Sequence, residues 1–154
     1  MDAGAFASLE AFLGRVPYVR FLGMQVEFAG DELTCLLPFS QHLVGNPMLP
    51  ALHGGVIGAF LEMTALAQLA LVHPSRQIPK TIDVNIDYLR SARAQTTYAR
   101  ANLRKVGRRV ANVQVEAWQE TRTQPVAGLT GHFLLPSQST SSHGRPQGDP
   151  GDPS

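Results

Sequence analysis

One carboxylate stands alone in a long apolar segment. Glu62 is the only charged residue between Gly54 and Val72, and the rest of this stretch is apolar, small or neutral. Burying an unpaired carboxylate is costly, and a core helix has no structural need for one. Glu62 is therefore either paired with a buried Arg or His or present for chemistry. We favour chemistry, because ionisable groups in unusual surroundings gather at functional sites.

The segment that carries Glu62 must be a helix or a membrane span. Its length would suit a membrane span. Glu62 at its midpoint, with Thr64 and Gln68 nearby, speaks against that reading, as does the lack of flanking basic clusters. The sequence therefore predicts a buried helix over residues 54–72 of a soluble protein, ending before Pro74, with no membrane partner.

The composition of the chain limits its partners and its compartment. The 154 residues carry a formal net charge of +1, and the basic residues are scattered, which does not indicate a nucleic-acid partner. The single cysteine, Cys35, excludes an internal disulfide and is read as an inert core thiol. The N-terminus lacks the features of a signal peptide, so a cytoplasmic protein is expected.

Periodicity places the other elements around the long helix. Helical spacing predicts an N-terminal helix over about residues 5–13, and residues 39–52 are rich in turn formers and predict a loop. In the stretch 81–89, alternation puts Ile82, Val84, Ile86 and Tyr88 on one face and Thr81 on the other. The predicted strands are 21–28, 33–37, 81–89, 96–105, 109–118 and 126–135.

This order of elements predicts an α+β domain over residues 1–136. Short connections favour antiparallel neighbours, and one curved antiparallel sheet around one central helix buries both elements. A sheet of this kind has open edges, so pairing with a second copy is expected, as a dimer or a dimer of dimers. Residues 137–154 contain no aliphatic or aromatic side chain, which predicts a disordered tail.

Three segments resemble one family. The run from Asn46 to Val56, which includes His53-Gly54-Gly55, is followed by an acid nine residues after the histidine, at Glu62. Together with the stretches 85–92 and 107–111, this run resembles the hot-dog-fold acyl-CoA thioesterases of the phenylacetate-pathway (PaaI-like) group. The resemblance covers roughly residues 20–135. It implies hydrolysis of an acyl-CoA thioester, with coenzyme A present only as part of the substrate, and shared active sites at a dimer interface.

Physical chemistry gives this pattern a mechanism. A helix N-terminus presents unpaired N–H groups and a partial positive charge, and the amides of Gly54 and Gly55 would polarise a docked thioester carbonyl. Glu62, from the facing subunit or through a shared cleft, would act as general base or as nucleophile. Gly54 and His53 are counted among the substrate-binding residues. The glycines could instead only permit tight packing, and a histidine at such a place more often locks a loop than carries a proton.

The resemblance implies further site residues. Asn46 would hold the attacking water or the loop, although it precedes His53 by seven residues where the family pattern has six. Thr81 matches a small hydroxyl residue that assists in some relatives, or it is a plain strand residue. Arg90 and Arg108 are the cations chosen for the phosphates of coenzyme A, because arginine binds phosphate through forked donors. Surface arginines at turns also serve solubility.

Two other functions stay open. The segment from His42 to Pro50 resembles the histidine-bearing loop of hot-dog hydroxyacyl-thioester dehydratases, which would use His42 with Glu62 on a 3-hydroxyacyl chain. A third possibility is a non-catalytic module that binds acyl-CoA. The histidines show no metal-ligand spacing, so neither a metal nor another cofactor is expected.

Overall fold

The structure, a computed structural model, describes residues 3–137. The predicted tail, apart from residue 137, and the first two residues lie outside the described part, so the tail and the domain limits 1–136 stay predictions. The elements, in chain order, are α1 (Ala3–Arg15), α2 (Pro17–Leu22), β1 (Gln25–Ala29), β2 (Glu32–Leu37), a 3-10 turn (Gln41–Leu43), β3 (Val44–Asn46), β4 (Ala51–Leu52), α3 (Gly54–Val72), β5 (Lys80–Tyr88), β6 (Thr97–Val106), β7 (Val110–Trp118) and β8 (Ala127–Leu134).

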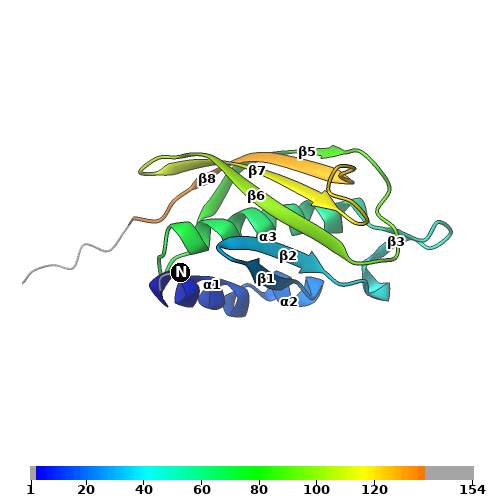
Figure 1. Cartoon of the computed structure of the whole chain (residues 1–154), viewed down its shortest axis with the longest axis horizontal. Coiled ribbons are helices and arrows are strands. Elements are labelled where there is room, and N and C mark those ends of the chain that lie inside the picture. The colour runs from blue at the N-terminus through cyan, green and yellow to red at the C-terminus, as the bar shows by residue number, and fades with distance from the viewer. Residues whose placement is uncertain (1–2, 138–154) are drawn as a thin grey trace, which may run out of the picture.

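One curved sheet covers the long helix, as predicted. Its six strands run in the order β1-β2-β6-β7-β8-β5, and every neighbouring pair is antiparallel. Figure 1 shows α3 between this sheet and the two N-terminal helices. Leu9 and Phe12 of α1 belong to the same buried cluster as the helix residues. The strands β1 and β5 form the two edges of the sheet.

Helix α3 is the core of the molecule and has the predicted bounds. Twelve of its nineteen residues are buried, on nearly every side of the helix. It is long and apolar enough to cross a membrane, but 72% of its most apolar window is buried inside the fold, as in the core helix of a soluble protein. His53 caps its start, and the helix ends at Val72, before His73.

The N-terminal region differs from the prediction. The first helix extends to Arg15, and the last two residues of a second helix, α2, are residues that were read as the start of a strand. Pro17 stands at the first turn of α2, where its fixed φ and missing N–H are tolerated. Gly23, with φ of +72°, ends the helix, so the strand begins only at Gln25. Leu22 is buried as a residue of helix α2, and its spacing from Met24 only resembles the alternation of a strand.

The loop predicted over 39–52 is partly regular. It contains the 3-10 turn and the short antiparallel pair β3–β4, which brings Val44 opposite Leu52. Periodicity could not find strands of two and three residues. This pair fixes the chain immediately before α3, and the His53 amide donates to the Leu43 carbonyl there at 2.9 Å.

An extra residue in β5 reverses the predicted face of Thr81. Thr81 pairs with Phe133 and Asp83 with the next residue, His132, so Ile82 is an additional residue on β5. Ile82 is consequently 53% exposed, whereas Thr81 lies on the face of β5 that contacts α3. The sequence predicted that Thr81 lies on the other face of the strand from Val84 and Ile86. This prediction was wrong, because a bulge interrupts the strict alternation of faces.

Candidate active site

The start of α3 is held by His53. The Gly55 amide donates to His53 Nδ1 at 2.9 Å, and the Val56 and Ile57 amides donate to the His53 carbonyl oxygen at 3.0 and 3.2 Å. A helix start leaves four N–H groups without an intrahelical partner, here those of residues 53–56. The bonds of the Gly55 and Val56 amides to His53, together with the bond of the His53 amide to the Leu43 carbonyl oxygen, satisfy three of them, and the Ile57 bond is the first regular bond of the helix. His53 thus has the locking role that sequence reasoning preferred, and it uses a ring nitrogen for it.

The fourth amide belongs to Gly54. Within residues 3–137 no hydrogen-bond acceptor is found for the Gly54 N–H. The amide lies at the positive end of the α3 dipole and Gly54 is exposed. Because the Gly55 amide is engaged by His53, the Gly54 amide is the donor that this structure leaves available. Polarisation of a carbonyl by Gly55 stays a prediction that would require His53 to release its bond.

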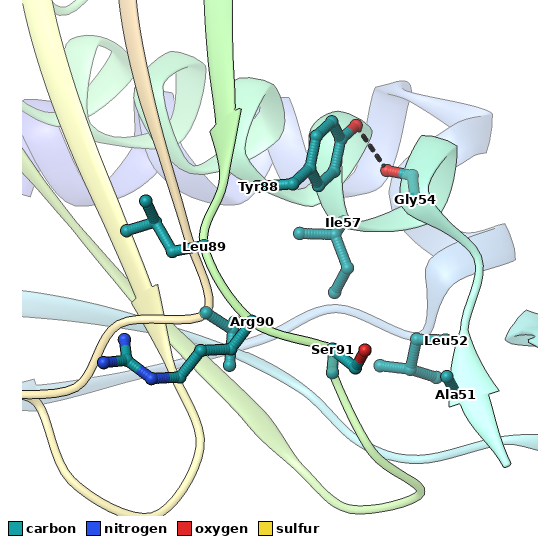
Figure 2. A pocket seen from close by; sticks show the side chains of 10 residues that line it. Ala51, Leu52, Gly54, Ile57, Tyr88, Leu89, Arg90 and Ser91 are labelled. Carbon is teal, nitrogen blue, oxygen red and sulfur yellow. Dashed lines mark hydrogen bonds between the residues drawn. The ribbon is translucent and has the colours of Figure 1, made fainter. Parts of the chain in front are cut away.

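A cleft opens beside this helix start. It has a volume of about 480 Å³ and lies between the first turn of α3, the end of β5 and the segment that follows β5. Figure 2 shows the Tyr88 side chain directed at Gly54, with Ile57 and Ser91 on the neighbouring walls. The Tyr88 hydroxyl donates to the Gly54 carbonyl oxygen at 2.7 Å. Sequence reasoning placed Tyr88 only on one face of the strand 81–89 and did not find this contact.

Glu62 lies further along the same helix and does not line the cleft. Its side chain is half-buried, and Thr81 Oγ1 donates to its Oε1 at 2.9 Å. Among the described residues the ion pairs are Arg100 with Glu32 and His132 with Asp83, so no buried Arg or His neutralises Glu62. This removes the alternative of an ion pair within residues 3–137. Thr81 therefore contacts the carboxylate, and its assistance in a reaction stays a prediction.

Eight residues separate Glu62 from Gly54. At a rise of about 1.5 Å per residue, the two lie about 12 Å apart along the helix axis. Eight residues make a little over two turns, so both positions lie toward the same side of α3. Strand β5 runs antiparallel to this half of the helix, since Thr81 contacts Glu62 while Tyr88 contacts Gly54. Gly54 and Glu62 therefore lie at opposite ends of the contact between α3 and β5.

The two chosen arginines also lie at opposite ends. Arg90 follows β5 directly, lines the cleft and donates to the Pro125 carbonyl oxygen at 2.8 Å. Arg108 is exposed on the turn between β6 and β7. Val110 pairs with Leu134, which pairs with Lys80, so this turn lies at the end of the sheet where β5 begins, near Thr81. A single chain does not bring Arg90 and Arg108 together.

Asn46 lies in the β3–β4 hairpin, outside the cleft. Its Oδ1 accepts a hydrogen bond from the Met48 amide at 3.0 Å, a local turn contact. The side chain is exposed. Asn46 is thus placed on the loop before the helix, and its role toward water stays a prediction.

The ring of His42 is fully engaged. Its Nε2 donates to the Phe21 carbonyl oxygen at 2.8 Å, and the Ser40 hydroxyl lies 2.7 Å from Nδ1. In the neutral tautomer that satisfies both contacts, Nε2 carries the proton and Nδ1 accepts a hydrogen bond from the Ser40 hydroxyl. Both ring nitrogens thus tie the loop to its neighbours, and a role of His42 as the base of a dehydratase would require the Ser40 contact to be released.

Two further candidates for chemistry are the Cys35 thiol and a metal site. Cys35 is fully buried, and burial raises the pKa of its thiol to about 12, which leaves it protonated and inert at neutral pH. In residues 3–137, no group of three His, Cys, Asp or Glu side chains is arranged to hold a metal ion. Independence from a metal stays a prediction.

Comparison with known proteins places this site in a family. The thioesterase superfamily matches residues 49–126, half of the chain, and the match includes the cleft, the helix start and Glu62. The chain therefore belongs to the thioesterase superfamily, and the protein is a thioester hydrolase. This confirms the enzyme class predicted from the sequence.

Individual relatives agree. The chain is 29% identical over 140 residues to the medium/long-chain acyl-CoA thioesterase YigI of Escherichia coli K12, covering 82% of this chain and 90% of YigI. A crystal structure of a protein from Chromobacterium violaceum is 38% identical, with a TM-score of 0.69 over 88% of this chain and 95% of that one. The PaaI protein from the phenylacetic acid degradation operon of Escherichia coli, 18% identical, has a TM-score of 0.72 over 87% and 94%. This likeness confirms the hot-dog fold.

Proposed function

We propose that the protein hydrolyses acyl-CoA thioesters, with Glu62 as its catalytic carboxylate. The observation that carries this proposal is a half-buried carboxylate that has one neutral donor, Thr81, and no cationic partner within residues 3–137. It lies on the helix whose start presents a cleft and an available amide, in a chain of the thioesterase superfamily. The relationship to YigI supports medium-chain or long-chain acyl groups as substrates.

The proposed reaction uses one donor and one carboxylate. The Gly54 N–H binds the thioester carbonyl oxygen and stabilises the negative charge that develops on it. Glu62 takes a proton from water, whose oxygen attacks the carbonyl carbon, or attacks that carbon itself. The carbon–sulfur bond breaks, and coenzyme A leaves as a thiolate that then takes up a proton. With direct attack, water hydrolyses the resulting anhydride in a second step.

We propose that each site takes its two halves from two chains. A general base must come within about 3 Å of the group it deprotonates, directly or through one water, whereas Gly54 and Glu62 of one chain lie about 12 Å apart along the helix. A second copy with its α3 antiparallel would place its own Glu62 beside this Gly54. The open edge of β5, with Ile82 and Tyr88 more than half exposed, supports pairing on this side.

The same two-fold arrangement would serve the nucleotide part of coenzyme A. It brings the β6–β7 turn of the second copy, with its Arg108, toward the end of the sheet that carries Arg90. Their guanidinium groups could then share the phosphates. Asn46, on the loop before the helix, would order water at this junction. A cytoplasmic location and the exclusion of membrane and nucleic-acid partners stay predictions.

Thiol release from a panel of acyl-CoAs tests the proposal. Free thiol is followed with a thiol reagent for acetyl, hexanoyl, decanoyl, palmitoyl and phenylacetyl esters, with wild type beside Glu62→Gln. Glutamine keeps the shape and removes the charge, and we expect kcat to fall by a factor on the order of 10²–10⁴, as for other general bases. An unchanged Glu62→Gln enzyme would refute the catalytic role, and no release from any ester by wild type would favour a binding module.

A further inference from the structure

The peptide unit that joins Gly54 to Gly55 is bound at both of its polar ends. Its carbonyl oxygen accepts a hydrogen bond from the Tyr88 hydroxyl at 2.7 Å. Its N–H donates to His53 Nδ1 at 2.9 Å. Figure 2 shows the Tyr88 ring reaching from the end of β5 to this carbonyl. Two side chains from different elements thus grip one peptide plane at the start of α3.

Two consecutive glycines are ordered by these two hydrogen bonds. Glycine has wider access to φ and ψ than any other residue, so a Gly-Gly helix start loses order easily. A tilt of this peptide plane changes ψ of Gly54 and φ of Gly55, and with them the direction of the first-turn amides. A hydrogen bond at the carbonyl also polarises this peptide and strengthens the bond that its Gly55 N–H donates to His53 Nδ1.

The next helical turn makes room for this contact. A Cβ at Gly58, one turn after Gly54, would lie 3.1 Å from the Tyr88 hydroxyl oxygen and 2.8 Å from Ile86 Cδ1. Any side chain at residue 58 would push β5 side chains off the helix. At Gly54 a Cβ would meet the Tyr88 ring at 3.6 Å, an ordinary contact. The close fit between β5 and the start of α3 therefore depends on Gly58.

We propose that Tyr88 is a positioning residue: its hydroxyl fixes the Gly54–Gly55 peptide and thereby the direction in which the start of α3 presents its amides to a bound carbonyl. This inference rests on the proposed thioester hydrolysis for its catalytic consequence but not for its structural part. Tyr88 does not touch the reacting atoms; it acts through the peptide that it holds.

Tyr88→Phe tests the structural part without any reaction. The substitution removes one hydroxyl and keeps the ring. Solvent exchange of the Gly55 amide proton, measured by NMR, should become about fivefold faster, the factor that one neutral hydrogen bond is worth. Tyr98→Phe is the matched control, because Tyr98 lies on β6 against Trp118 and contacts neither glycine. An unchanged Gly55 exchange rate in Tyr88→Phe would overturn the proposal.

Kinetics test the catalytic part. With the best acyl-CoA, we expect kcat of Tyr88→Phe to fall about fivefold while KM changes less than twofold, because a misdirected amide weakens transition-state binding. Gly58→Ala, which displaces the same hydroxyl, should reproduce this change. A Tyr88→Phe enzyme with faster Gly55 exchange but normal kcat would overturn the positioning role.

The two proposals fail in different ways. If Glu62→Gln loses turnover and Tyr88→Phe changes nothing, the thioesterase mechanism stands and the Tyr88 proposal falls. If wild type releases no thiol from any ester, the proposed function falls. The Gly55 exchange rate then decides alone whether Tyr88 holds the peptide.

Discussion

The two ends of the contact between α3 and β5 are built differently. At the helix start, His53 and Tyr88 together bind both ends of one peptide, and the first turn is held by two further hydrogen bonds, from the Val56 and Ile57 amides to the His53 carbonyl oxygen. At the other end, Glu62 receives a single hydrogen bond, from Thr81. An ionised carboxylate can accept about four hydrogen bonds, so Glu62 keeps capacity for water.

This difference matches the two tasks of a hydrolase. A donor that stabilises developing charge works best when it is fixed in advance, because it then needs no reorganisation during the reaction. A carboxylate that handles a proton must instead reach its water and change partners. The helix start is thus the rigid half of the proposed site and Glu62 the adaptable half.

Removing the available amide should break the rigid half most severely. Gly54→Pro deletes one N–H at the first helical position, where proline is tolerated, and His53 already has the extended backbone (φ −63°, ψ 135°) that a residue before proline prefers. We expect kcat to fall by a factor on the order of 10²–10³, as for loss of an oxyanion-hole donor. Circular dichroism should show an intact fold.

Gly54→Ala is the matched variant. It keeps the N–H, and its Cβ would meet Tyr88 only at an ordinary contact distance of 3.6 Å. It should lose far less activity than Gly54→Pro in the same thiol-release assay. Equal losses in both variants would point to crowding of the cleft, and full activity of Gly54→Pro would exclude this amide as the donor.

The sequence predicted the features that depend on local contacts and missed those that depend on contacts between distant segments. The bounds of α3 were predicted because neighbouring residues mark both ends: His53-Gly54-Gly55 at the start and Pro74 after the end. The face of Thr81 was not, because the extra residue Ile82 depends on how β5 pairs with β8. The contact of Tyr88 with Gly54 joins residues 34 apart in sequence, and no spacing rule predicts such a pair.

The site residues show the same limit. Glu62 was identified by its isolation in an apolar segment, and Thr81 by resemblance alone. Arg90 and Arg108 were grouped by charge, yet strand pairing puts them at opposite ends of the sheet. The helix α2 was missed because Leu22 and Met24 are both buried and imitate a strand.

Loosening the adaptable half should have a smaller effect. Thr81→Val removes the hydroxyl that donates to Glu62 Oε1 and keeps a side chain of similar shape. We expect kcat to fall about fivefold, the value of one hydrogen bond. Thr81→Ser, which retains the hydroxyl, should stay much closer to wild type. Identical kinetics of the Val and Ser variants would show that Thr81 does not orient the carboxylate.

The buried thiol of Cys35 should give the unfolding free energy no pH dependence near neutral pH. Cys35 lies beside Thr64 of α3, and burial raises the pKa of its thiol from 9.0 to about 12. Below pH 9 both folded and unfolded chains keep the proton. Between pH 9 and 12 only the unfolded chain loses it, so this group lowers the unfolding free energy by about 1.4 kcal/mol per pH unit.

Denaturant unfolding of wild type beside Cys35→Ala measures this contribution. The difference between their unfolding free energies should be constant up to pH 9 and should shrink at higher pH. Parallel curves up to pH 11 would contradict a sealed thiol at this position. A sealed Cys35 also leaves the thiol reagent of the activity assay without a background reaction in the folded protein.

Mixing two inactive variants tests the central claim, that a fixed helix start and Glu62 of a second chain form one site. Gly54→Pro and Glu62→Gln are unfolded together, refolded at equal amounts and assayed for thiol release. If sites are shared, a mixed dimer has one intact site, and random pairing should restore about one quarter of wild-type activity. If each chain uses its own Gly54 and Glu62, no site is intact, and activity that stays at the level of the separate variants would contradict the account.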